Sequence, residues 1–183
     1  MSATDRPPDA GTAPGAPACA AVTAGLLAAA RPQHPRLLVE DSAFARFVAP
    51  LLAGADAPDE ALAPFAGDLY LACGCALGVP AAVARFEALC LPVARAAVAR
   101  VTAQPQHLDD VMQELRARLL CAGESGSPPR IARYAGRGPL IAWVRTAAVR
   151  LALDRLREHR REVALPDDEE DLAPAALGGA HGH

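Results

Sequence analysis

The sequence predicts an all-α protein with one modest domain and extended tails. Its 183 residues suffice for a single domain. Hydrophobic residues make up 52% of the chain, but alanine raises that share, and only 4% of residues are aromatic. Alanine favours helix more than any other residue, and apolar residues recur at helical spacing along much of the chain. We therefore expect a small helical bundle.

The N-terminal segment is rich in Ala, Pro and Gly, a composition that predicts a disordered tail over residues 1–35. Within it, Ala16–Ala30 has the apolar character of a signal-peptide core. The residues before this run carry a net charge of −1, whereas a signal peptide needs a positive one. No uncharged apolar run reaches the roughly 20 residues that span a bilayer. We expect the tail to run into a helix and the protein to stay in the cytoplasm, without membrane contact.

A helical extension is expected over residues 36–66, with an amphipathic helix over 36–52 and a break at 54–58. The main domain is expected over residues 67–161, and an acidic linker or tail over 162–183.

The domain begins with two helices, over 64–77 and 80–101, that are expected to form an antiparallel hairpin. Gly78 is placed as a helix C-cap, and Pro80 suits the first turn of the next helix. Pro92 lies inside the second helix and is expected to kink it. After a break at residues 104–107, two further helices are expected over 108–122 and 139–161, separated by a Gly/Ser/Pro loop and a tight glycine turn.

Charge is distributed unevenly along the chain. Residues 1–129 hold 9 Arg and 13 acidic residues, whereas residues 130–161 hold 9 Arg and 2 acidic residues, a balance of +7. Residues 162–183 hold 6 acidic residues and no Arg, and the whole chain lacks Lys. A concentrated basic block beside an acidic tail indicates a polyanionic partner, and nucleic acid is the first candidate.

The helix over 139–161 has two distinct faces. At about 100° per residue, one face is an apolar stripe of Leu140, Val144, Ala147 and Leu151. The adjoining face collects Trp143, Arg150, Arg157 and Arg161, with Asp154 within reach of Arg150 and Arg157. Arginine neutralises phosphates and an exposed indole stacks on unpaired bases, so this face fits nucleic acid. The alternative is a core tryptophan beside arginines that are merely solvated.

A glycine loop precedes that helix. Gly136 and Gly138 flank Arg137 without the G-x-G-x-x-G spacing, or the preceding strand, of a nucleotide-binding loop. Both glycines are expected to permit backbone angles that other residues avoid. A loop built in this way also lets a base approach the backbone closely.

The helix over 108–122 has an apolar row of Val111, Leu115 and Leu119. A separate acidic, hydrogen-bonding patch, which fits an arginine-rich partner helix, consists of Asp110, Gln113 and Glu114. An ordinary solvated face explains the same pattern. Because no His, nucleophile or metal-ligand set is expected beside these carboxylates, we predict that the protein is not an enzyme and needs no cofactor or metal.

The five cysteines form no disulfide framework, because their number is odd and most lie in apolar helical stretches. The Cys73/Cys75 pair lacks the second pair of ligands that a zinc site needs. Small buried hydrophobes in a reducing cytosol are the expected role of Cys19, Cys73, Cys75, Cys90 and Cys121.

The order of these motifs resembles region 2 of the sigma-70 family of RNA polymerase sigma factors, especially the small extracytoplasmic-function type. Asp-Asp-Val-Met-Gln-Glu (109–114) looks like the family's D-x-x-Q-E signature. Two later stretches look like the family's F/Y-x-G-x-x-x-L-x-x-W-L and A-x-D-x-L-R motifs: Arg-Tyr-Ala-Gly-Arg-Gly-Pro-Leu-Ile-Ala-Trp-Val (133–144) and Leu-Ala-Leu-Asp-Arg-Leu-Arg (151–157). The likeness spans about residues 68–161.

The resemblance implies a transcription initiation factor that binds core RNA polymerase and melts promoter DNA. Asp110, Gln113 and Glu114 would face the clamp helices of the polymerase β′ subunit. The single-stranded non-template strand of the −10 element would be bound by Tyr134, Gly136, Arg137, Gly138, Trp143, Arg150, Arg157, Arg160 and Arg161. The resemblance also allows an anti-sigma factor as a regulatory partner.

Three departures from the family pattern bear on this hypothesis. Arg150 stands where these factors often carry Asn, and Arg116 stands where the docking helix usually has an aromatic residue. Nothing after Arg161 resembles region 4, which reads the −35 element, although the acidic stretch 167–171 looks like the linker that leads there. Two rival hypotheses therefore stay open: a sigma-derived competitor that occupies polymerase without initiating, and a helical protein-interaction module.

Overall fold

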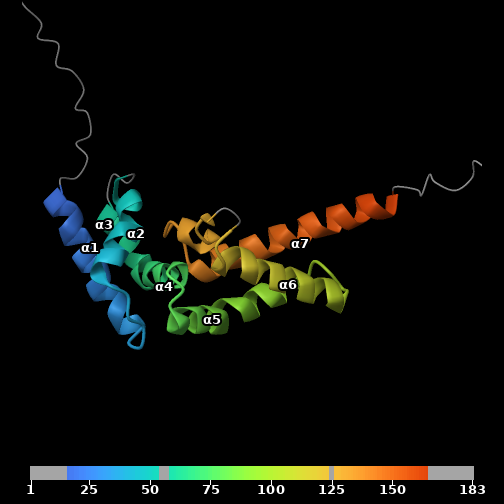
Figure 1. Cartoon of the computed structure of the whole chain (residues 1–183), viewed down its shortest axis with the longest axis horizontal. Coiled ribbons are helices and arrows are strands. Elements are labelled where there is room, and N and C mark those ends of the chain that lie inside the picture. The colour runs from blue at the N-terminus through green and yellow to red at the C-terminus, as the bar shows by residue number, and fades with distance from the viewer. Residues whose placement is uncertain (1–15, 54–57, 124–125, 165–183) are drawn as a thin grey trace, which may run out of the picture.

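The computed structural model describes residues 16–53, 58–123 and 126–164, and within these ranges the chain forms helices and turns without a β-strand. The all-α prediction is confirmed. In Figure 1 the arrangement is elongated, with α1 (Ala16–Ala30), α2 (Asp41–Ala53) and α3 (Pro58–Leu62) at one end. The other end consists of α5 (Pro80–Val98), α6 (Pro105–Leu120) and α7 (Leu140–Ala164), with α4 (Ala66–Ala76) between the two groups. Short 3-10 segments are η1 (Arg31–Gln33), η2 (Ala63–Phe65) and η4 (Arg130–Arg133).

The central helix α4 is buried on almost every side and contacts α1, α2, α5 and η4. Small residues allow this close packing: a Cβ added at Gly74 would lie 2.7 Å from the Cβ of Ala82 on α5. The α4–α5 turn has the predicted features, since Gly78 adopts a φ of +70° after the end of α4 and Pro80 opens α5. This turn reverses the chain, and α5 packs directly against the central helix α4, as expected for a helical hairpin.

Apolar rows at i, i+4 spacing hold α5, α6 and α7 together. α5 buries Phe86, Cys90, Ala94 and Val98, and α6 buries the predicted row of Val111, Leu115 and Leu119. α7 packs mainly along α5 and also contacts α6. Its predicted stripe is confirmed at Leu140, Val144 and Leu151, while Ala148 is buried where Ala147 is only half-buried.

The N-terminal prediction of a disordered tail over 1–35 is wrong from residue 16 onward. Residues 16–30 form α1, and residues 1–15 lie outside the described ranges. α1 contacts α4, and it buries Leu26, Leu27 and Ala30. An Ala/Pro-rich composition is compatible with a tail, but alanine also has high helix propensity, and burial of the two leucines adds the tertiary packing that most protein helices need.

The helix expected over 36–52 begins only at Asp41, because residues 37–39 are held outside a helix by a residue from α4. The buried Tyr70 hydroxyl accepts a hydrogen bond from the Val39 N–H (3.0 Å) and donates one to the Leu37 carbonyl (3.1 Å). These two bonds satisfy backbone groups that are buried beside the core. The expected break at 54–58 falls mostly outside the described residues.

Two helix boundaries also differ from the sequence prediction. α6 begins at Pro105, inside the expected break at 104–107, because proline suits the first helical position. α7 continues to Ala164, so the first residues of the expected acidic tail over 162–183 belong to that helix. Among the helices described, none combines the length and apolar character of a membrane span.

Candidate nucleic-acid interface

The basic row on α7 lies on the surface of the bundle. Arg150, Arg157 and Arg161 are exposed, and they follow one another along one face of the helix. Asp154 pairs with Arg157 at 2.8 Å, whereas neither Arg150 nor Arg161 has an ion pair among the described residues. Arg160 is also exposed but lies to the side of this row, because each residue turns the helix by about 100°.

Trp143 is half-buried, which corrects the expectation of an exposed indole. Its ring packs edge-on against Tyr134, with the ring centroids 5.9 Å apart and the planes at 64°. The indole lines a hollow of about 250 Å³, called here the tryptophan hollow, together with Arg118, Arg130 and Arg150. Leu115, Leu119 and Leu151 contribute apolar lining. One part of the indole therefore belongs to the core, and the rest borders a hollow with three guanidiniums.

Arg118 and Arg130 were not singled out from the sequence as members of this site. Arg118 comes from α6 and Arg130 from η4, so they meet Trp143 only through the fold. Arg130 belongs to the basic block over 130–161, which was the one available signal for it. Arg118 lies outside that block, and no spacing within α6 relates it to a residue on α7.

The loop before α7 is built for packing at two of the four positions predicted to contact DNA, Tyr134 and Gly136. Tyr134 is only 2% exposed, and its hydroxyl donates a 2.6 Å hydrogen bond to the carbonyl of Gly138. Burial raises the pKa of this phenol well above its usual range. Gly136 is buried against Leu62 and Leu69, whereas Arg137 is exposed. In this conformation only Arg137 offers a fully accessible side chain to a ligand.

The two glycines of the loop differ in backbone conformation. Gly136 adopts a φ of +63°, and a Cβ there would lie 3.1 Å from Leu62, so the predicted need for glycine is confirmed. Gly138 is not among the described glycines with positive φ, and a Cβ there would meet no atom within 4 Å. The same expectation is wrong for Gly138.

Asp68 fixes the start of α7 and was missed in the sequence. The carboxylate comes from the first turn of α4, and its Oδ2 accepts a 2.8 Å hydrogen bond from the Leu140 N–H. The first N–H groups of a helix lack partners within the helix, and a carboxylate there also stabilises the helix dipole. A residue 72 positions away in sequence thus holds the end of α7 that carries Trp143.

The predicted polymerase-binding residues do not form one uniform exposed patch. Asp110 and Gln113 are exposed, but the Glu114 side chain is only 19% exposed and is already paired. Its Oε2 accepts a 2.6 Å hydrogen bond from Arg155 Nε on α7 and forms an ion pair with Arg155 Nη2 at 2.5 Å. Its Oε1 pairs with Arg118. The hydrogen bond to Glu114 raises the pKa of Arg155 above its usual value.

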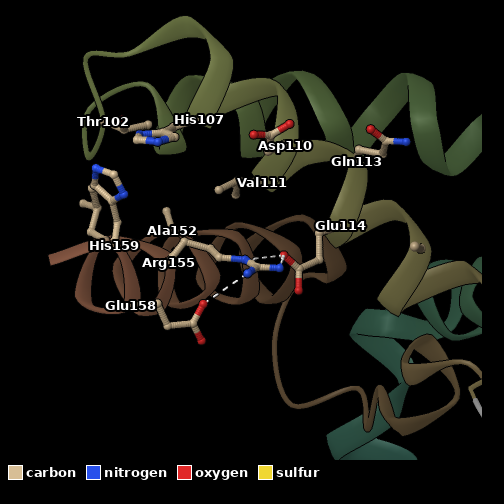
Figure 2. A pocket seen from close by; sticks show the side chains of 12 residues that line it. Thr102, His107, Asp110, Val111, Gln113, Glu114, Ala152, Arg155, Glu158 and His159 are labelled. Atoms are coloured by element: carbon tan, nitrogen blue, oxygen red, sulfur yellow. Dashed lines mark hydrogen bonds and ion pairs between the residues drawn. The ribbon is translucent and has the colours of Figure 1, made fainter. Parts of the chain in front are cut away.

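A groove of about 590 Å³ runs between α6 and α7, beside these residues (Figure 2). His107 from α6 and His159 from α7 face each other across it, with ring centroids 5.2 Å apart. The expectation that no histidine accompanies Asp110 and Glu114 is therefore wrong, since all four residues line the groove. The spacing of His107 and Asp110 within α6 was the available signal, but His159 joins them only through the packing of α7.

Two other sequence features have clear structural outcomes. Arg116, which departs from the family pattern, forms a 2.8 Å ion pair with Glu87 on α5. Burial raises the pKa of the Cys73 thiol to about 11 and those of Cys75 and Cys90 to about 12. The expected burial is confirmed for these three cysteines, but Cys19 is half-buried and Cys121 is exposed.

Comparison of the chain with protein-family models, curated proteins and solved structures gave no match. Function must therefore be inferred from the residues themselves. Chemically, the tryptophan hollow offers part of an indole, apolar lining and three cations. These are the groups that bind stacked bases and phosphates.

Proposed function

We propose that this protein binds single-stranded nucleic acid along α7 and acts as a sigma-factor-like component of transcription initiation. The observation that carries the proposal is the tryptophan hollow, which Arg118, Arg130 and Arg150 line together with a half-buried indole. Stacking of a base on an aromatic ring contributes about 1–3 kcal/mol. Extruding a base from a duplex costs a few kcal/mol, so stacking and phosphate contacts together can offset that cost.

The resemblance to sigma region 2 supports the more specific proposal. The D-x-x-Q-E-like residues lie on α6, and the tryptophan and arginines lie on the neighbouring α7. Exposed Asp110 and Gln113 are available to a basic partner helix. Under this proposal α6 docks on the clamp helices of core RNA polymerase, α7 binds the opened −10 strand, and no bond is broken by the protein.

The proposal is tested by the affinity of the chain for a labelled single-stranded oligonucleotide, measured by anisotropy at low salt. We expect Arg150→Ala to weaken binding about three- to tenfold, because it removes a charged contact to phosphate. The matched control is Arg145→Ala, since Arg145 is exposed on the opposite face of the same helix. Equal losses in the two variants would mean that only overall charge matters.

Trp143 provides a second variant pair. Trp143→Ala is expected to weaken strand binding more than Trp143→Phe, because phenylalanine keeps a ring on which a base can stack. Circular dichroism establishes that both variants are folded. Docking to core polymerase should be largely unaffected by either change, and loss of both activities together would indicate that Trp143 acts only through the core.

Polymerase docking is tested by pull-down with purified core enzyme. Asp110→Ala combined with Gln113→Ala should reduce capture, while Arg145→Ala should not. Absence of capture by the folded wild-type chain would reject the sigma-like part of the proposal and leave strand binding to be judged separately.

A polymerase competitor is the second candidate, favoured by the internal pairing of Glu114 and by the Arg116–Glu87 ion pair on the docking helix. It predicts polymerase capture without RNA synthesis from any matching promoter in a reconstituted transcription assay. Promoter-dependent RNA would exclude it.

A further inference from the structure

Glu114 is placed between the two surfaces to which the proposed function assigns different partners. It belongs to the predicted polymerase-facing residues of α6, yet its carboxylate contacts Arg155 on α7 and Arg118 on its own helix. Figure 2 shows the Glu114 and Arg155 side chains pointing toward each other across the α6–α7 groove. Arg155 is further held by Glu158 at 3.1 Å.

The two arginines that Glu114 binds also line the nucleic-acid side of α7. Arg118 lines the tryptophan hollow and a neighbouring hollow of about 280 Å³, called here the arginine hollow, which also contains Arg155, Arg157 and Arg161. Arg118, Leu151 and Asp154 line both hollows, which therefore adjoin each other along α7. Arg155 lines both the arginine hollow and the α6–α7 groove.

We propose that Glu114 couples the two surfaces: in the free chain it holds Arg118 and Arg155, and a cationic partner that captures its carboxylate releases both guanidiniums to the strand bound along α7. The proposal rests on the proposed function. It assigns Glu114 a regulatory role in addition to docking.

The physical basis is competition for one carboxylate. An arginine paired with Glu114 contributes little net positive charge to an approaching phosphate. Release from Glu114 gives Arg118 a full charge and leaves Arg155 paired only with the exposed Glu158. A partner binds Glu114 more strongly when nucleic acid has already drawn the two arginines away from its carboxylate. Because such coupling is reciprocal, that partner also makes nucleic acid bind more strongly. Polymerase and single strand would therefore each increase the affinity of the other.

The first experiment measures single-strand affinity of the free chain after Glu114→Gln, with Asp109→Asn as the matched control. Both changes remove one negative charge from α6, but Asp109 pairs with Arg95 on α5 rather than with α7. We expect Glu114→Gln to tighten binding about two- to fivefold, the range for releasing exposed ion pairs. Asp109→Asn should change it less than twofold.

The decisive experiment is a double-mutant cycle. If Glu114 acts through Arg155 and Arg118, the gain from Glu114→Gln must disappear in a chain that already carries Arg155→Ala and Arg118→Ala. Persistence of the full gain in that background would overturn the coupling, because the effect would then be general electrostatics. Circular dichroism and thermal melting of each variant establish that the comparison involves folded chains.

Failure of the coupling and failure of the proposed function give different results. If no variant, including wild type, binds a single strand, the proposed function itself fails and the coupling with it. If all bind and Glu114→Gln behaves like Asp109→Asn, only the coupling is overturned. Adding core polymerase to wild type should raise strand affinity, and this increase should be smaller for Glu114→Gln.

Discussion

The two ends of the molecule use their residues differently. α1 contains no charged residue and the central α4 contains only Asp68, so these two helices consist almost entirely of small and apolar side chains, and they pack against each other. α7 buries one apolar face and presents arginines on the other. Under the proposed function, the N-terminal helices would contribute mainly to stability, whereas the α6–α7 surface would carry the contacts with partners. Variants in the two regions should therefore have separable effects.

The largest effect on stability is expected from Phe44→Ala in α2. Phe44 is fully buried and packs edge-on against Tyr70, with ring centroids 5.7 Å apart. Loss of the ring leaves a cavity, and we expect the free energy of unfolding to fall by about 3–5 kcal/mol. Urea unfolding of the variant and the wild type measures this difference in the free energy of unfolding. If the two ends are one cooperative unit, Trp143 emission and circular dichroism will report the same lowered midpoint; separate transitions would divide the molecule into independent parts.

A smaller loss is expected from Gly136→Ala, which tests the junction between the two regions. A β-carbon there would meet Leu62 and Leu69, and the alanine would have to adopt the positive φ of Gly136. We therefore expect the free energy of unfolding to fall by about 1–3 kcal/mol. Gly138→Ala, two residues away, is the matched control and should change the free energy of unfolding by less than about 0.5 kcal/mol. Similar losses would contradict the difference in packing between the two glycines.

Asp68→Ala should cost about 1 kcal/mol, the usual effect of removing a helix-capping side chain. Asp68→Asn keeps an acceptor for the Leu140 N–H and should cost less. Thermal melting compares the two. Equal destabilisation would show that the negative charge, rather than the hydrogen bond, holds the start of α7.

The smallest effect on stability is expected from Arg150→Ala, within about 0.5 kcal/mol, because the side chain is exposed. The same variant is expected to weaken strand binding. A large loss of stability with unchanged binding would reverse the assignment of the two regions.

Local signals in the sequence predicted much of the C-terminal architecture. The i, i+4 rows of α6 and α7 specify packing faces, and the glycine after α4 specifies a turn. Each of these signals is contained in a short stretch of sequence. α1 was missed because Leu26 and Leu27 count as anchors only once α4 is known to lie beside them. The late start of α2 depends on Tyr70, whose hydroxyl reaches residues more than 30 positions earlier.

The site was predictable to the extent that its residues share one helix. Periodicity placed Trp143 and Arg150 on one face, and both line the tryptophan hollow. It gave no indication that Arg118 and Arg130 complete that hollow, or that Glu114 is bound by Arg155, because those contacts join different elements. Nor could it indicate that Tyr134 is buried, since an aromatic residue in a loop is compatible with either environment.

Intrinsic fluorescence of Trp143 tests the central claim most directly, because this residue is the only tryptophan in the chain. Titration with a single-stranded oligonucleotide should quench its emission in a saturable way, and added salt should weaken the binding because phosphate contacts release counterions. Duplex of the same length should quench less. Anisotropy-detected strand binding with unchanged tryptophan emission, or no strand binding at low salt by the folded chain, would contradict the placement of opened nucleic acid in the tryptophan hollow.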